Sequence, residues 1–224
     1  MFSWFSRGDQ GVGGQEKMRA EFGQMLDAGR HIFDAAANAF LGGTDVEVIR
    51  PDLFETDKRI NHAEQRIRRE IVVHATVHGP VSFPACLVLM SIVKDAERLG
   101  DYAKNIFDLA ELSKDPPAGV FKDDMVKLKD RISHLMASCR EAFDKHDEEV
   151  AKELIGEAEA IEDHCDAQIS KILTQAEPSD MDATFALAYR YFKRITSHSF
   201  NVLTSIVQPI DKLDFSDDRP DSEQ

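Results

Sequence analysis

Long helical segments separated by glycine and proline dominate this sequence. Between residues 15 and 209, apolar side chains recur at the three- and four-residue spacing of a buried helical stripe. Strand signals are nearly absent, because Val and Ile follow the helical period and do not alternate. Six helices are predicted, with breaks at Gly42-Gly43, Gly79-Pro80, residues 115–119, His146-Asp147 and Pro178. Pro51 is expected in the first turn of the second helix, and the chain is predicted to be all-α.

Three helices, a Pro-rich break and three more helices indicate an internal repeat. A shift of 96 residues places residues 193–202 under residues 97–106 and aligns, among others, Asn105 with Asn201. We therefore predict two tandem three-helix bundles, at residues 15–114 and 120–210. An N-terminal segment (residues 1–14) precedes them, and an acidic, disordered tail (residues 211–224) follows.

Charge and cysteine content narrow the class of protein. The net charge of −14, from 41 acidic and 27 basic residues, repels phosphate backbones and argues against nucleic-acid binding. The three cysteines show no C-x-x-C spacing, which predicts neither a disulfide framework nor a structural zinc site and fits a reducing cytoplasm. No segment reaches the roughly 18 consecutive apolar residues of a membrane span. The first ten residues lack the features of a signal peptide, so we expect a cytoplasmic protein.

The run KDAERLGDYAKNI (residues 94–106) contains the best candidate site. Glu97 and Asp101 are four residues apart, so a helix places both carboxylates on one face, where they could hold a hard cation with water. Gly100 lies between them and would let a second helix or a hydrated ion approach closely. The alternative is a solvated face on which these carboxylates pair with nearby Lys94, Arg98 or Lys104. Both interpretations remain open at this point.

Other polar groups favour structural interpretations. His164 and Cys165 are adjacent and point about 100° apart on a helix, so we expect Cys165 to face inward on a wet acidic helix. His198 occupies the position equivalent to Tyr102 and is expected to pack or cap. Two groups remain ambiguous. The first comprises Phe2, Trp4 and Phe5, which either pack loosely or contact a partner or membrane surface. The second comprises Lys58, Arg59, Arg66, Arg68 and Arg69, which form a solvated face or meet an anionic partner or phosphate.

Enzyme chemistry has little support in this sequence. G-x-S-x-G, a phosphate-binding glycine loop and H-E-x-x-H are all missing from it. A di-iron oxidase in a helical bundle would need matched Glu-x-x-His pairs, and the sequence offers none. We therefore expect a protein that is not an enzyme.

Residues 94–106 resemble the signature of the PhoU family, in which an acidic-Glu-Arg-hydrophobic-Gly-Asp run is followed by an Asn-hydrophobic pair. The resemblance extends over nearly the whole chain and includes the DKRIN run at residues 57–61 and Glu64. It implies tandem three-helix bundles and E-x-x-x-D motifs, one set per repeat, that bind metal ions in several members. It also implies regulation of phosphate uptake and of its two-component signalling.

Carried onto this sequence, the resemblance implies a metal site formed by Glu97 and Asp101, with Asp95 just before them and Glu64 as a supporting carboxylate. The implied cofactor is a Mg, Mn, Fe or Zn ion. The implied partners are a phosphate ABC transporter or another phosphate permease and a sensor histidine kinase, with peripheral membrane association through these partners, and a homodimer.

The second repeat departs from the family pattern. Lys193 and Ser197 occupy the positions equivalent to the two carboxylates, so we expect a second metal site to be absent or remodelled. The alternative function is a helical adaptor of another transporter that does not bind metal.

Overall fold

The computed structural model describes residues 12–113 and 116–213. Its elements are α1 (Val12–Phe40), α2 (Val46–His78), the 3-10 turn η1 (Gly79–Val81), α3 (Phe83–Leu112), α4 (Val120–Lys145), α5 (Glu148–Thr174), α6 (Asp182–Val207) and η2 (Ile210–Lys212). These residues contain no strand, which confirms the predicted all-α class. The expectations for Phe2, Trp4 and Phe5, and for the tail beyond residue 213, lie outside the described residues.

The helices end where the local sequence predicts. Gly42 and Gly79 adopt φ values of 84° and 68°, in the left-handed region that glycine tolerates, and they follow α1 and α2. His146 ends α4 in the left-handed conformation, with φ of 52°. Asp147 then caps α5, because its carboxylate accepts a hydrogen bond from the backbone N–H of Val150 at 3.1 Å.

The start of α2 differs from the prediction. The helix begins at Val46, because the carboxylate of Asp45 accepts a hydrogen bond from the backbone N–H of Glu47 at 2.9 Å and caps the first turn. Pro51 therefore lies inside the helix and not in its first turn, so that prediction was wrong. The cap chemistry of Asp45 determines where the helix starts.

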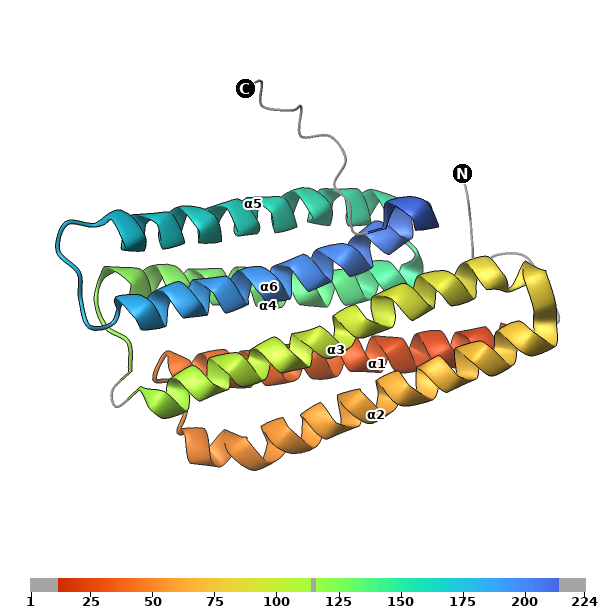
Figure 1. Cartoon of the computed structure of the whole chain (residues 1–224), viewed down its shortest axis with the longest axis horizontal. Coiled ribbons are helices and arrows are strands. Elements are labelled where there is room, and N and C mark those ends of the chain that lie inside the picture. Colours follow the sequence, from red (N-terminus) through yellow and green to blue (C-terminus); the bar gives the residue numbers. More distant parts are fainter. Residues whose placement is uncertain (1–11, 114–115, 214–224) are drawn as a thin grey trace, which may run out of the picture.

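The six helices form two three-helix bundles that lie side by side (Figure 1). Helices α1–α3 make the first bundle and α4–α6 the second, as the tandem prediction requires. The bundles meet where α3 packs on α6 and α1 packs on α4. Aromatic rings join them: Phe33 and Phe192 lie 5.5 Å apart, and Phe22 and Phe143 lie 4.8 Å apart, between ring centroids. The two bundles therefore share one continuous hydrophobic core.

The α3–α6 contact shows a pseudo-twofold relation between the repeats. On one side, the buried Asp95 lies 2.8 Å from Nδ1 of His198. By the 96-residue offset, Asp95 corresponds to Tyr191 and His198 corresponds to Tyr102. The ring centroids of these two tyrosines lie 6.2 Å apart, on the other side of the same contact. Tyr102 also stacks on His198 at 5.6 Å, so His198 packs in the interface as the sequence predicts.

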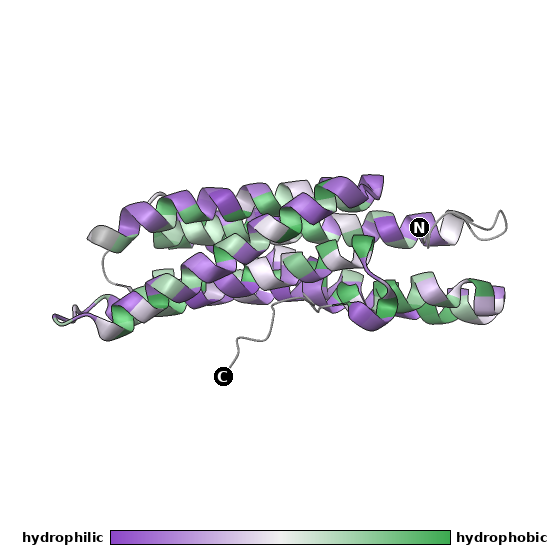
Figure 2. Cartoon of the chain, turned by 90° about the horizontal axis from the view of Figure 1, so that it is seen from above, coloured by the Kyte–Doolittle hydropathy of each residue, from purple (hydrophilic) through white to green (hydrophobic). Residues whose placement is uncertain are grey.

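The helices are amphipathic, and hydrophilic and hydrophobic residues are mixed along their length (Figure 2). In the two described ranges, no helix combines the length and the apolar composition that a membrane span requires. The apolar faces pack inward and supply the core.

His74 is a buried imidazole near the end of α2, where α1 begins. A Cβ on Gly14 would lie 3.0 Å from its Nδ1, and its ring centroid lies 4.2 Å from that of His78. Burial lowers the pKa of His74 below its ordinary value of 6.5, and the nearby His78 lowers this pKa further. Folding therefore disfavours the protonated form of this side chain.

Acidification from pH 7 to pH 5 is expected to lower the free energy of unfolding through His74. The unfolded imidazole binds a proton near pH 6.5 and the folded one binds it at lower pH, so stability is lost as the pH falls through this window. Urea denaturation at both pH values measures the loss, and His74→Gln should reduce it. The exposed His62 provides the control variant His62→Gln, which should leave the loss unchanged. Equal losses in the wild type and in His74→Gln would contradict the assignment.

Candidate functional site

Four carboxylates meet between α2 and α3. Asp57 and Glu64 come from α2, and Glu97 and Asp101 come from α3. Asp57, Glu64 and Glu97 are buried, whereas the side chain of Asp101 is 29% exposed. Carboxylates are rarely buried unless they are paired, so their counter-charges decide what this site can do.

Lys104 neutralises one pair of these carboxylates. Its Nζ lies 2.9 Å from Oδ1 of Asp57 and 3.1 Å from Oδ1 of Asp101. Burial on its own would lower the pKa of Lys104, but the hydrogen bonds with Asp57 and Asp101 outweigh burial and raise this pKa above its ordinary value. Lys104 is therefore held in its charged form between the two helices.

Lys94 neutralises the other pair. Its Nζ lies 2.6 Å from Oε2 of Glu97 and 4.0 Å from Oε1 of Glu64, and Arg68 lies 3.0 Å from the same Glu64 oxygen. Oε1 of Glu64 and Oε2 of Glu97 are buried, and within the described part of the chain neither accepts a well-aligned hydrogen bond. The ion pairs with Lys94 and Arg98 anticipated from the sequence are thus present, and Arg98 lies 3.1 Å from Asp101.

Gly100 allows α2 to approach α3 at the Lys104 pair. A Cβ at this position would lie 3.3 Å from Oδ1 of Asp57 and 3.4 Å from Cδ1 of Ile60. The glycine therefore leaves room for the Asp57 carboxylate to reach Lys104. Its place inside a helix, which costs about 1 kcal/mol relative to alanine, has a structural reason.

Gly100→Leu is expected to lower the free energy of unfolding by more than about 2 kcal/mol. The larger side chain must displace Asp57 from Lys104 and overpack against Ile60. Thermal denaturation followed by circular dichroism measures the effect, with Gly156→Leu as the control because a Cβ on Gly156 meets nothing within 4 Å. A melting temperature equal to that of the control would contradict this account.

Asp95 does not join the site. It lies on the side of α3 that faces α6, where its Oδ1 accepts a hydrogen bond from Asn201 at 2.8 Å and lies 2.8 Å from His198. Two helical positions separate it from Glu97, which turns the side chain by about 200°. The grouping of Asp95 with Glu97 and Asp101 is therefore corrected, and Asp95 connects the two bundles.

The carboxylates form two lysine-bridged pairs. Within residues 12–113 and 116–213, no group of three or more His, Cys, Asp or Glu side chains is arranged to hold a metal ion. In this arrangement the residues do not fit a resident metal, because Lys94 and Lys104 already supply the positive charge. Metal binding at Glu97 and Asp101 would require these ammonium groups to move.

The second repeat replaces its carboxylates as the sequence indicates. Lys193, equivalent to Glu97, forms an ion pair with Asp166 of α5. Ser197, equivalent to Asp101, donates a hydrogen bond to Glu162 at 2.7 Å. Lysine is therefore a counter-cation at the corresponding helix pair of both repeats.

Asp124 of α4 links its neighbours in the second bundle. Its carboxylate lies 2.9 Å from Nε2 of His164 and accepts a hydrogen bond from the hydroxyl of Tyr189 at 2.6 Å. Burial raises the pKa of Tyr189, and the hydrogen bond with Asp124 raises it further. Cys165 faces the core, as predicted, and burial raises its pKa to about 12. His164 and Cys165 therefore do not act together as ligands.

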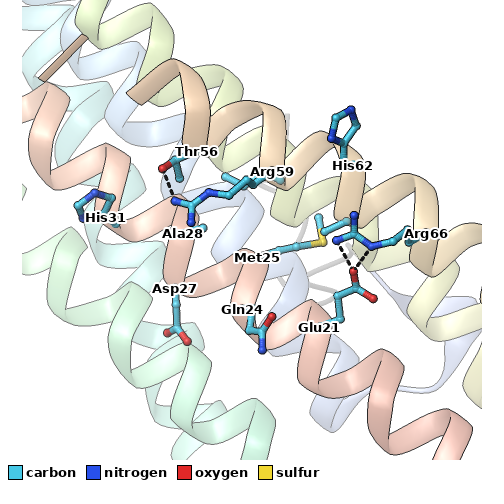
Figure 3. Close-up of a pocket in the computed structure, with 12 residues that line it drawn as sticks. Glu21, Gln24, Met25, Asp27, Ala28, His31, Thr56, Arg59, His62 and Arg66 are labelled. Atoms are coloured by element: carbon cyan, nitrogen blue, oxygen red, sulfur yellow. Dashed lines mark hydrogen bonds and ion pairs between the residues drawn. The ribbon is translucent and has the colours of Figure 1, made fainter. Parts of the chain in front are cut away.

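A groove of about 460 Å³ between α1 and α2 contains two of the arginines noted in the sequence (Figure 3). Arg66 is paired with Glu21, to whose Oε1 its Nε donates at 2.6 Å. Arg59 donates to the hydroxyl of Thr56 at 2.6 Å and, among the described residues, has no carboxylate within ion-pair range. Its guanidinium can therefore bind an anionic group of a ligand or partner.

One carboxylate of the site, Asp57, is missing from the residues predicted for it. Lys94 and Lys104, which the alternative interpretation of the sequence named as ion-pair partners, supply the charges that hold the carboxylates in place. The signal for Asp57 is its spacing, because positions 57, 60, 64, 67 and 71 recur every three or four residues and place Asp57 and Glu64 on the apolar stripe of α2.

Comparison with known proteins relates the chain to one family. Residues 22–110 match the family model of the PhoU domain. A Synechocystis sp. protein described as a phosphate-specific transport system accessory protein PhoU homolog is 24% identical over 157 residues, which are 66% of this chain and 68% of the relative.

Two crystal structures share the fold over most of the chain. PhoU from Pseudomonas aeruginosa superimposes with a TM-score of 0.76 at 18% identity, over 88% of this chain and 97% of that one. The phosphate transport system regulatory protein PhoU from Streptococcus pneumoniae gives a TM-score of 0.70 at 17% identity, over 86% and 92%. The fold thus defines a protein of two tandem three-helix bundles, which is the fold of these two PhoU structures. The chain contains a PhoU domain at residues 22–110.

Proposed function

We propose that this chain is a cytoplasmic regulator of phosphate transport that acts through contacts with other proteins. The observation that supports the proposal is the PhoU domain at residues 22–110 within a tandem bundle that aligns with PhoU proteins over most of its length. The Synechocystis relative and the Streptococcus pneumoniae protein are both named as components of phosphate transport systems. Regulation by contact is compatible with the ion pairs of Glu97 with Lys94 and of Asp57 with Lys104, which join neighbouring turns and helices.

The partners we propose are a phosphate ABC transporter or another phosphate permease and a sensor histidine kinase. Contact with them would place the protein at the membrane and couple uptake to phosphate-responsive two-component signalling. A homodimer belongs to the same proposal. Arg59 in the α1–α2 groove is a candidate contact for an acidic partner segment.

Deletion of the gene tests the regulatory proposal. Phosphate uptake and phosphate-responsive transcription are expected to become insensitive to external phosphate, and the wild-type gene should restore both responses. Cross-linking followed by identification of the captured membrane proteins would then name the partner. If uptake and transcription are unchanged in the deletion strain, the proposal fails, and an adaptor of another transporter becomes the better description.

Metal binding at Glu97 and Asp101 is a second, separate proposal. An Mg, Mn, Fe or Zn ion would gain the incompletely hydrogen-bonded oxygens of Glu64 and Glu97 but would have to displace Lys94 from Glu97 and Lys104 from Asp101. Isothermal titration of the wild type and of Asp101→Ala with each metal tests it. Binding that Asp101→Ala removes would support the site, whereas identical traces for both proteins would rule it out.

A further inference from the structure

Exposed hydrophobic side chains gather at the end of the α2–α3 hairpin. Six of the thirteen large exposed hydrophobics in the described residues lie here: Val72, Val73, Val77, Val81, Phe83 and Leu87. Val81, in the η1 turn, is 79% exposed, and Val77 is 70% exposed. Isolated exposed apolar residues are ordinary, but a cluster of this kind on one end of a protein indicates a contact surface.

The charge of this hairpin end differs from that of the rest of the chain. Residues 71–94 contain no Asp or Glu, although the protein has 41 acidic residues and a net charge of −14. Of the four basic residues in residues 65–94, only Arg69 has no carboxylate within ion-pair range among the described residues, because Arg66, Arg68 and Lys94 pair with glutamates. Arg69 lines the same groove as Val73 and Val77. The hairpin end is therefore apolar and free of carboxylates over residues 71–94, and Arg69 beside it is a cation that can meet an anionic surface.

The hairpin end extends past the ends of α4, α5 and α6, as Figure 1 shows. The second bundle does not cover it in this view. A broad, flat surface can therefore reach the η1 turn without meeting the second bundle.

The apolar residues lie on two sides of α2. Val72, Phe83 and Leu87 line a groove of about 340 Å³ between α2 and α3. Val73 and Val77 line a different groove, of about 350 Å³, between α1 and α2. A folded protein partner would cover one of these sides, whereas lipid acyl chains can surround the whole end.

We propose that the α2–α3 hairpin end inserts into the surface of a bilayer that contains anionic lipids. Val77, Val81 and Phe83 would enter the boundary between headgroups and acyl chains, and Arg69 would meet lipid phosphates. The insertion is shallow and does not require a membrane-spanning helix. The proposal is independent of the regulatory function, because it concerns lipid and not a transport protein.

Flotation with vesicles tests the proposal. The wild type is expected to float with vesicles of phosphatidylcholine containing phosphatidylglycerol at about one third of the lipid, and to float poorly with pure phosphatidylcholine. The double variant Val77→Glu/Leu87→Glu should reduce the bound fraction about tenfold or more. The matched control is Val48→Glu/Leu173→Glu, which changes side chains that are 72% and 74% exposed elsewhere and should bind as the wild type does.

Further measurements distinguish the electrostatic contribution to vesicle binding from the apolar one. Arg69→Gln and high salt should both weaken binding to the anionic vesicles, because both act on the electrostatic part. Circular dichroism should show unchanged helicity in every variant, so that a loss of binding reports the surface. Failure of the wild type to float with anionic vesicles would overturn the proposal, as would equal losses in the hairpin and control variants. A concentration-dependent dimer that only the hairpin variants abolish, without vesicle binding, would assign the surface to a second copy instead.

Discussion

Phe192→Ala is expected to lower the free energy of unfolding by about 3–5 kcal/mol, among the largest effects that one substitution can have in this protein. Phe192 is fully buried in α6 and meets Phe33 of α1 edge to face at 5.5 Å between centroids. Its removal leaves a cavity in the core that both bundles share. Urea denaturation followed by circular dichroism at 222 nm measures the change.

The same experiment tests whether the two bundles fold as one unit. Because the core is continuous, both the wild type and Phe192→Ala should show one cooperative transition. Leu173→Ala is the control, since Leu173 is 74% exposed and its truncation should change stability by less than about 0.5 kcal/mol. Two resolved transitions would mean that each bundle unfolds on its own and that the shared core contributes little.

Lys104→Met is expected to lower the free energy of unfolding by about 2 kcal/mol. The change removes the cation that Asp57 and Asp101 share, while Arg98 still pairs with Asp101. The estimate lies below the range for fully buried pairs because Lys104 is 25% exposed. Lys127→Met removes an exposed lysine of α4 and serves as the matched control. Thermal denaturation in chelator measures the difference between the two variants.

Millimolar Mg²⁺ or Mn²⁺ should then restore part of the stability of Lys104→Met, because the freed carboxylates can bind a hard cation. The wild type and Lys127→Met should gain much less. If metal leaves the melting temperature of Lys104→Met unchanged, Asp57 and Asp101 are not a latent cation site. If the wild type gains as much as the variant, Lys104 does not compete with metal.

The sequence predicts the helices well because their ends depend on local chemistry. Glycine at positive φ after α1 and α2, and the cap at Asp147, can be recognised from a few neighbouring residues. Pro51 is the exception, since proline is common in the first turn but Asp45 caps the helix earlier. The 96-residue offset is also visible in the sequence, and the α3–α6 contact agrees with it.

The site is only partly predictable, because its charges meet across two helices. The Glu97–Asp101 face follows from spacing within α3, whereas the placement of Asp57 against Lys104 depends on how α2 is rotated and on the space left by Gly100. The position of Asp95 could have been derived, since two helical steps turn it away from Glu97. Whether a metal ion or a lysine neutralises these carboxylates can be decided only from the distances between the side chains in the structure.

The interface between α3 and α6 has a consequence for how the two halves recognise each other. Two copies of the first repeat, joined about the same pseudo-twofold axis, would place each Asp95 against Tyr102 of the other copy in place of His198, whereas Asn105 would take the position of Asn201. The buried carboxylate would then lose its histidine partner. Divergence at positions 102 and 198 thus gives Asp95 a histidine partner only across two unlike repeats. The second repeat therefore supplies, within the same chain, the partner that this buried carboxylate of the first repeat uses.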